Sequence, residues 1–147
     1  MGEAKRDTGP DFSPARPGRV LLTGASGFIG GCLWKRFQEL GWDVVATGRR
    51  PMARPGYVQH DLALPLPTAL LQRFDVVIHA AAKSSPWGRP REFQAANVQA
   101  TRHILDLCQS LGFPRLIYIS SSSVYYRPEH QLAINEATPI PARKINL

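Results

Sequence analysis

Three glycines near the start of the chain, Gly24, Gly27 and Gly30, have the spacing of a dinucleotide-binding turn. Between a strand and a helix, such glycines permit a tight bend, let the backbone approach a pyrophosphate, and bring helix and strand close together. The phosphates would meet the free N–H groups and the positive dipole end of a helix beginning near Gly27. A purely structural glycine turn is the alternative. The predicted cofactor contacts in this stretch are Gly24, Ser26, Gly27, Phe28, Ile29 and Gly30.

The residues after the second predicted strand indicate which dinucleotide binds. A dinucleotide fold commonly has Asp or Glu there, roughly 20 residues beyond the glycines, to hold the ribose 2′-OH of NAD. Here that position is Gly48, and Arg49 and Arg50 follow it. No carboxylate is present to repel a 2′-phosphate, and guanidinium groups bind phosphate bidentately. The pattern favours NADP over NAD, unless both arginines are solvated loop charges.

Two further candidate contacts follow the third and fourth predicted strands. Asp61, with Leu62 after it, could accept a hydrogen bond from the adenine amino group, although an Asp that caps a helix is an alternative. The small side chains of Ala80, Ala81 and Ala82 would let the backbone pass close to the cofactor. Both segments are therefore added to the predicted cofactor site.

Three polar features complete the candidate site. His79 is expected to pack in the core or at a strand end rather than to act as a catalyst. Asn97 lies beside the apolar stripe of a long predicted helix, where it is satisfied locally or fixes a loop or water near the site. In the run Ser120–Ser123, a hydroxyl could donate to a substrate carbonyl near the nicotinamide, and a serine-rich turn is the alternative.

Alternating strands and helices would hold these residues at one edge of a sheet. Apolar runs predict strands at 19–22, 43–47, 57–59, 75–79 and 115–119. Apolar residues at helical spacing predict helices at 65–73, at 91–111, and between Gly27 and Gly41, the last with the stripe Ile29, Leu33, Phe37 and Leu40. This order predicts an α/β fold with a Rossmann-type, doubly wound parallel sheet of five strands. Ligands bind such sheets at the carboxyl ends of the strands, where the residues above lie.

Composition limits the other possibilities. A chain of 147 residues with 44% apolar content suffices for one domain, predicted at 19–147, after a leader at 1–18 expected to be disordered. No run approaches the roughly 18 to 20 apolar residues of a membrane span, and no secretory signal is apparent. The net charge of +7 is scattered, so nucleic-acid binding is not predicted. Cys32 and Cys108 are expected to be buried thiols of a cytoplasmic protein.

These motifs together resemble a known family. Thr23–Gly30 resembles the TGxxGxxG signature of extended short-chain dehydrogenases/reductases, which include NAD(P)-dependent epimerases, dehydratases and reductases. The segments at 61–62, 79–82, 97–101 and 119–125 resemble later blocks of that family, in the same order. The segments 81–88 and 93–97 look similar to the 3β-hydroxysteroid dehydrogenase-like branch. The resemblance implies a Rossmann sheet with a C-terminal substrate domain, a catalytic serine at Ser121, a cofactor contact at Ser120, and a homodimer that packs through the long helix.

The sequence departs from the family at one point. The family's general acid/base is the tyrosine of a YxxxK motif, whose lysine lowers the tyrosine pKa from about 10 toward the working pH. None of Tyr57, Tyr118, Tyr125 and Tyr126 is followed by Lys four residues later. We therefore expect residues 1–147 to be the cofactor-binding part of a longer enzyme, with the catalytic tyrosine and lysine beyond Leu147. This part alone is expected to bind cofactor weakly and to turn nothing over.

The resulting hypothesis is an NADP(H)-dependent oxidoreductase that interconverts a secondary alcohol and a ketone on a small organic substrate. Two alternatives stay open at this point. One is a nucleotide-sugar epimerase or dehydratase, and the other is a non-catalytic NADP-sensing protein that lacks the Tyr-Lys pair.

Overall fold

A computed structural model describes residues 17–128 and 132–141 of the chain. In this part of the chain, five strands form one sheet in which all neighbouring strands are parallel and the order is β3-β2-β1-β4-β5. The strands are β1 (Arg19–Thr23), β2 (Asp43–Gly48), β3 (Tyr57–Gln59), β4 (Val76–His79) and β5 (Arg115–Tyr118). The predicted Rossmann-type α/β fold is confirmed.

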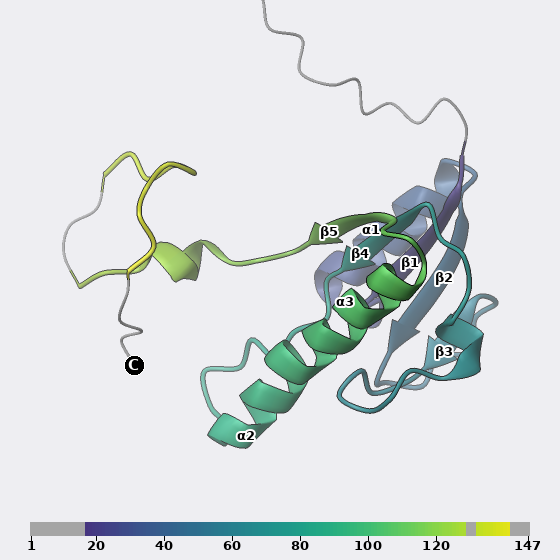
Figure 1. Ribbon diagram of the computed structural model, residues 1–147, viewed down its shortest axis with the longest axis horizontal. Coiled ribbons are helices and arrows are strands. Elements are labelled where there is room, and N and C mark those ends of the chain that lie inside the picture. The colour runs from purple at the N-terminus through teal and green to yellow at the C-terminus, as the bar shows by residue number, and fades with distance from the viewer. Residues whose placement is uncertain (1–16, 129–131, 142–147) are drawn as a thin grey trace, which may run out of the picture.

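Helices cover both faces of the sheet (Figure 1). Helix α1 (Phe28–Glu39) lies on one face, and α3 (Ala100–Ser110) lies on the other. Successive side chains of a strand point to opposite faces, so Leu21 packs in the cluster that contains Ile104 of α3. Val20 packs in the other cluster, which contains Trp34 of α1. The near-continuous apolar sequence of β1 reflects this burial on both sides.

The buried face of α1 differs from the predicted stripe. Leu33 and Phe37 pack partly against the core, but Gly30 and Trp34 are the residues of this helix that are fully buried. Ile29 and Leu40 are exposed. A Cβ atom at Gly30 would overlap the Gly24 carbonyl, so this side of the helix packs directly on the glycine turn. Trp34, four residues after Gly30 and on the same side, is the large side chain of α1 that is buried.

The buried side of α1 also corrects the prediction for one cysteine. Cys32 lies two residues beyond Gly30, on the opposite side of the helix, and its thiol is exposed. Cys108 of α3 is buried as predicted, and burial raises its thiol pKa because the low-dielectric interior disfavours the thiolate. The expectation of two buried thiols is therefore wrong for Cys32.

The predicted helix at 65–73 is a single 3₁₀ turn, η1 (Thr68–Leu70). Pro65 and Pro67 lack the N–H groups that a longer helix would need, so the turn begins only after Pro67. Leu70 and Phe74 nevertheless reach the core as the pattern suggested. No helix connects β2 to β3 in the structure, so strands and helices do not alternate at every step.

The long helix predicted at 91–111 is present and begins one residue earlier. It consists of α2 (Pro90–Phe93), a π-helical segment η2 (Gln94–Gln99) and α3, in direct succession. Its apolar residues Ala100, Ile104 and Leu107 are buried. A π segment inside an α-helix inserts an extra residue and frequently marks a functional site. This segment carries Ala96 and Asn97.

The predicted leader lies outside the described residues except for Pro17 and Gly18, and the Gly18 carbonyl accepts a hydrogen bond from the Asp43 N–H group (3.0 Å). After β5 the chain extends away from the sheet and forms a short 3₁₀ turn, η3 (Ser122–Tyr125) (Figure 1). None of the helices in the described residues has both the length and the apolar character needed to cross a bilayer.

The predicted end of the domain, Leu147, lies outside the described residues, the last of which is Pro141. The tyrosine and lysine expected beyond Leu147 lie outside them as well. Both therefore stay predictions.

Candidate functional site

The glycine turn joins β1 to α1 with no space for larger residues. Gly24 has a φ of +70°, and a Cβ atom there would lie 2.7 Å from backbone atoms of Ala80 and Ala81. A Cβ atom at Gly30 would lie 2.2 Å from the Gly24 carbonyl oxygen. The first glycine therefore permits a left-handed bend beside the β4 loop, and the third lets the helix pack on the turn.

The N-terminus of α1 is free to bind an anion. Gly27 occupies the N-cap position and provides no side-chain cap, and the first turn of the helix contains no acidic residue. The first N–H groups of a helix have no acceptor within the helix, and their dipoles favour negative charge. This end of the helix therefore has the chemistry that a cofactor pyrophosphate requires.

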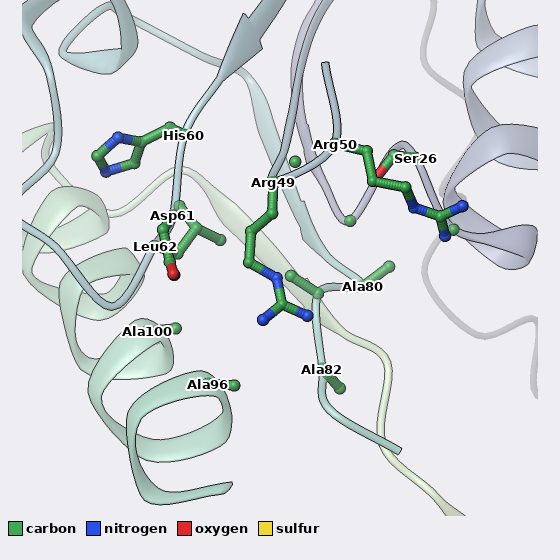
Figure 2. A pocket seen from close by; sticks show the side chains of 14 residues that line it. Ser26, Arg49, Arg50, His60, Asp61, Leu62, Ala80, Ala82, Ala96 and Ala100 are labelled. Atoms are coloured by element: carbon green, nitrogen blue, oxygen red, sulfur yellow. The ribbon is translucent and has the colours of Figure 1, made fainter. Parts of the chain in front are cut away.

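A cavity at the carboxyl ends of the strands brings together most of the predicted cofactor contacts (Figure 2). Segments from five parts of the chain meet there: the glycine turn, the end of β2, the loop after β3, the loop after β4 (the β4 loop) and the long helix. The predicted residues that line the cavity are Gly24, Ser26, Gly27, Arg49, Arg50, Asp61, Leu62, Ala80, Ala81 and Ala82. Their contact with a cofactor stays a prediction.

The other predicted residues do not line the cavity. Phe28, Ile29 and Gly30 lie in the first turn of α1, behind the glycine bend. Asn97 lies in η2 and contacts the β4 loop. Ser120 and Ser121 lie beyond β5 in the exposed segment that extends from the sheet.

The two arginines extend in different directions. The Arg49 side chain enters the cavity, toward the space between Ala82 and Ala96, whereas Arg50 extends past Ser26 (Figure 2). Both are exposed. Two guanidinium groups at the end of β2 give this side of the cavity a positive charge, while Asp61 is the carboxylate among the lining residues. The cavity is therefore suited to a ligand with several phosphates.

Four residues in the cavity lining are not among the contacts predicted from the sequence. Gly48 directly precedes Arg49, His60 directly precedes Asp61, and Ala96 and Ala100 face the cavity from the long helix (Figure 2). The two alanines are four residues apart, which places them on the same side of a helix, and their small size was the available signal.

His79 is buried at the end of β4 and joins two elements beneath the cavity. Its Nε2 atom lies 3.0 Å from the Thr101 hydroxyl oxygen, and the Thr101 hydroxyl lies 2.7 Å from the Asn97 carbonyl oxygen. A carbonyl can only accept, so Thr101 donates to Asn97 and accepts a hydrogen bond from His79 Nε2. Burial lowers the pKa of His79 to about 4, so the ring is neutral near pH 7.

The other nitrogen of His79 fixes the glycine turn. With the proton on Nε2, the Nδ1 atom accepts from the Thr23 hydroxyl at 2.7 Å. The Thr23 oxygen in turn accepts the N–H groups of Ala80 and Ala81, each at 3.1 Å. One neutral tautomer thus connects the residue before Gly24, the β4 loop and the π segment. The prediction of a packed strand-end histidine is confirmed.

Asn97 holds the loop that follows Ala82. Its Oδ1 atom accepts the Lys83 N–H group at 2.7 Å, and its Nδ2 group donates to the Lys83 carbonyl at 3.1 Å. The Lys83 ammonium pairs with Glu92 at 3.0 Å, and this ion pair lowers the Glu92 pKa. Of the two possibilities that the sequence left open, loop fixation is the one that these bonds support.

Two polar links hold the loop after β3. Asp61 Oδ1 accepts the Ala63 N–H group at 3.0 Å, which is a local turn bond, and no helix begins between Asp61 and Pro67. His103 Nδ1 donates to the Leu62 carbonyl at 2.8 Å, and His103 Nε2 accepts from Gln99 at 3.0 Å. The loop with Asp61 and Leu62 is thereby attached to α3, a link that sequence spacing did not indicate.

The serine run after β5 forms a local turn. Ser121 precedes η3, its oxygen accepts the Ser123 N–H group at 3.2 Å, and the two hydroxyl oxygens are 2.8 Å apart. β5 ends at Tyr118, one residue earlier than predicted. These contacts are those of the serine-rich turn, and a role of Ser121 toward a substrate stays a prediction.

Comparison with known proteins identifies relatives with the same fold. The pattern of the family described as "NAD dependent epimerase/dehydratase family" matches residues 20–145. The chain is 30% identical over 155 residues to a 2-alkyl-3-oxoalkanoate reductase of Shewanella oneidensis, which covers 98% of this chain and 39% of that protein. It is also 34% identical over 113 residues to methionine adenosyltransferase 2 subunit beta of Rattus norvegicus, covering 73% of this chain and 33% of that protein.

Solved structures with bound NAD are similar as well. A short-chain dehydrogenase/reductase superfamily protein of Agrobacterium tumefaciens with bound NAD matches with a TM-score of 0.73 and 28% identity, over 86% of this chain and 40% of that one. The structure of MoeE5 with UDP-glucose and NAD matches with a TM-score of 0.67 and 35% identity, over 74% of this chain and 38% of that one. The 147 residues thus span well under half the length of these proteins.

Proposed function

The chain belongs to the NAD-dependent epimerase/dehydratase family of extended short-chain dehydrogenases/reductases, and from this we propose that the whole protein is an NADP(H)-dependent oxidoreductase. Its reaction would interconvert a secondary alcohol and a ketone on a small organic substrate. The relative of Shewanella oneidensis that bears the name of an oxoalkanoate reductase supports this reaction class. The loop with Pro86, Trp87 and Gly88 supports a place near the 3β-hydroxysteroid dehydrogenase-like branch.

The observation that carries the proposal is the cavity itself. Glycines without space for a Cβ atom, an uncapped helix N-terminus and two arginines meet in it. A dinucleotide fits this set of groups, because its pyrophosphate needs close backbone N–H groups. Gly48 occupies the position where a carboxylate would select NAD, and Arg49 and Arg50 directly after it support binding of the 2′-phosphate of NADP.

Each part of the chain would have a separate task in this reaction. The helix N-terminus would bind the pyrophosphate, Arg49 and Arg50 the 2′-phosphate, and the alanines of the β4 loop would give the cofactor room to extend. When bound, the nicotinamide would supply or accept a hydride at the reacting carbon. Ser121 would donate a hydrogen bond to the substrate carbonyl. The proton would be exchanged with a tyrosine of a Tyr-x-x-x-Lys motif, which the sequence up to Leu147 lacks.

Cofactor choice can be tested by titrating the full-length protein with NADP and NAD. Arg49→Ala and Arg50→Ala should each weaken NADP binding about tenfold, corresponding to about 1.4 kcal/mol for one charge-assisted contact, and change NAD binding little. Arg102→Ala on α3 is the matched control, because Arg102 is exposed and does not line the cavity. Tighter binding of NAD than of NADP by the wild-type protein would contradict the proposed cofactor.

The reaction itself needs a second measurement. We expect NADPH oxidation by the full-length protein with β-keto acids or small ketones, and no turnover by residues 1–147 alone. Reduction catalysed by residues 1–147 would contradict the proposed need for a tyrosine elsewhere.

A non-catalytic role is the second candidate, and one relative favours it. The protein of Rattus norvegicus carries a name that describes it as a subunit of an adenosyltransferase. Under this alternative the cavity binds NADP as a signal, and the full-length protein lacks the Tyr-x-x-x-Lys motif. NADP binding without reduction of any ketone in a substrate panel would support it.

A nucleotide-sugar epimerase or dehydratase is the third candidate. Among the similar structures is one of UDP-galactose 4-epimerase, with a TM-score of 0.69 and 30% identity. Such an enzyme would convert UDP-sugars without net consumption of cofactor, so chromatography of UDP-galactose and UDP-glucose mixtures distinguishes it from a ketone reductase.

A further inference from the structure

We propose that Tyr57 and Gln59 of β3 are positioning residues that set the choice between NADP and NAD. They hold the backbone of Arg49 and Arg50, so that the turn is already shaped to present its arginines to a 2′-phosphate. This inference rests on the proposed binding of NADP at the end of β2. It concerns residues that do not themselves line the cavity.

The tether consists of two hydrogen bonds from one short strand. The Tyr57 hydroxyl donates to the Arg50 carbonyl at 2.5 Å. The Gln59 Nε2 group donates to the Arg49 carbonyl at 3.1 Å. Residues two apart on a strand point to the same side, so Tyr57 and Gln59 reach the turn together. The carbonyls of both consecutive arginines are therefore held by β3.

The tyrosine is anchored to the core of the protein. Its ring stacks on the indole of Trp34, with centroids 5.7 Å apart and an angle of 17° between the planes. Trp34 is fully buried, and the Arg54 guanidinium carbon lies 4.2 Å from the centroid of its ring, in a cation–π contact. The Tyr57 hydroxyl is thus a fixed donor, which lets it hold an exposed turn in one geometry.

The absence of a side chain at Gly48 leaves room for the tether. A Cβ atom at Gly48 would lie 2.8 Å from the Ser26 hydroxyl oxygen and 2.9 Å from the Tyr57 hydroxyl oxygen. Any side chain at this position, an acidic one included, would require one or both of these hydroxyl groups to shift. Glycine at position 48 therefore leaves room for the Tyr57 hydroxyl group beside the turn.

A turn that is ordered before binding gives tighter binding. Arg49 and Arg50 are exposed, and an untethered turn would lose backbone freedom when it closed on a phosphate. The tether removes this cost only for a ligand that contacts the turn. NADP carries the 2′-phosphate and NAD does not, so the tether should act on the ratio of the two affinities.

The test compares Tyr57→Phe and Gln59→Leu in the full-length protein. Tyr57→Phe keeps the ring on Trp34 and removes only the donor. Titration calorimetry with NADP and NAD should show a rise of about fivefold in the NADP dissociation constant for each variant, with a change of less than about twofold for NAD. Hydrogen exchange of the backbone amides around residues 48–52 should accelerate in both cofactor-free variants.

Gln72→Leu is the matched control, because the Gln72 Nε2 group also donates to a backbone carbonyl, that of Ala69, away from the cavity. It should leave both affinities unchanged. Two outcomes would overturn the tether and leave the proposed function intact. In one, the wild-type protein prefers NADP and the preference is unchanged in Tyr57→Phe and Gln59→Leu. In the other, the dissociation constants for NADP and NAD rise equally in these variants. A wild-type preference for NAD would overturn both.

Discussion

At the scale of single residues, two buried hydroxyl groups of the sheet differ in whether they have hydrogen-bond partners. Thr23 and Thr47 are partners in the register of β1 and β2, and both are fully buried. The Thr23 hydroxyl donates to His79 and accepts two N–H groups, whereas the Thr47 hydroxyl has no hydrogen-bond partner in the described part of the chain. Two threonines in equivalent surroundings therefore contribute differently to stability.

Replacement of each threonine by valine tests this difference. Thr47→Val should raise the free energy of unfolding by about 1 kcal/mol, because it removes an unpaired buried hydroxyl at constant shape. Thr23→Val should lower it by about 2 kcal/mol, because it leaves His79 Nδ1 and two N–H groups without a partner. Urea unfolding followed by circular dichroism measures both. Equal effects of the two substitutions would contradict the assignment.

At the scale of elements, the β1–α1 unit depends on how closely the helix approaches the turn. Gly30 and Gly31 are neighbours in the first turn of α1, but they face different surroundings. A Cβ atom at Gly30 would overlap the Gly24 carbonyl, whereas one at Gly31 would lie 3.7 Å from the nearest atom, the Ala25 carbonyl oxygen. The packing of this helix thus requires glycine at one position and not at the next.

Alanine substitution at the two positions should give opposite results. Gly30→Ala should destabilise the protein by several kcal/mol, in the range of about 3 kcal/mol or more for strained core contacts, and abolish NADP binding. Gly31→Ala should be neutral or stabilise by about 0.5–1 kcal/mol, because alanine favours helix. Thermal unfolding and NADP titration provide the readouts. A Gly30→Ala protein as stable as Gly31→Ala would disprove the close contact.

At the scale of the whole molecule, the buried histidine links stability to pH. The folded-state pKa of His79 is lowered by burial to about 4, below the 6.5 of an unperturbed histidine. Between these values the unfolded chain binds more protons than the folded protein, so the free energy of unfolding rises with pH. Charging the ring would also remove the acceptor for Thr23 and break the link beneath the cavity.

Stability measured across this pH window should show the effect. Between about pH 6.5 and pH 4 the His79 contribution should lower the free energy of unfolding by up to about 3 kcal/mol, and it should level off below about pH 4. His79→Gln cannot titrate, so its stability should fall less over the same window. Urea titrations of both proteins at several pH values measure the difference. Parallel pH profiles would refute the assignment to His79.

Several parts of the fold and candidate site could be predicted because the signal was local. Gly24, Gly27 and Gly30 lie within one turn, and their spacing between a strand and a helix indicated the bend. Arg49 and Arg50 directly follow a strand that the apolar run of β2 made evident. The predicted buried side of α1 was wrong for a reason that spacing does not show. Ile29 and Leu40 have helical spacing but are exposed, whereas Gly30 packs against the Gly24 carbonyl.

By itself, the sequence determined the strands, the glycine bend and the charge at the end of β2, because each depends on neighbouring residues. Only the tertiary structure decided the links between distant residues. Thr23 and His79 are 56 positions apart, and their bond follows from the parallel register of β1 and β4. The bond between Tyr57 and Arg50 likewise depends on the register of β3 against β2, and no spacing along the chain specifies the atoms that this pairing brings together.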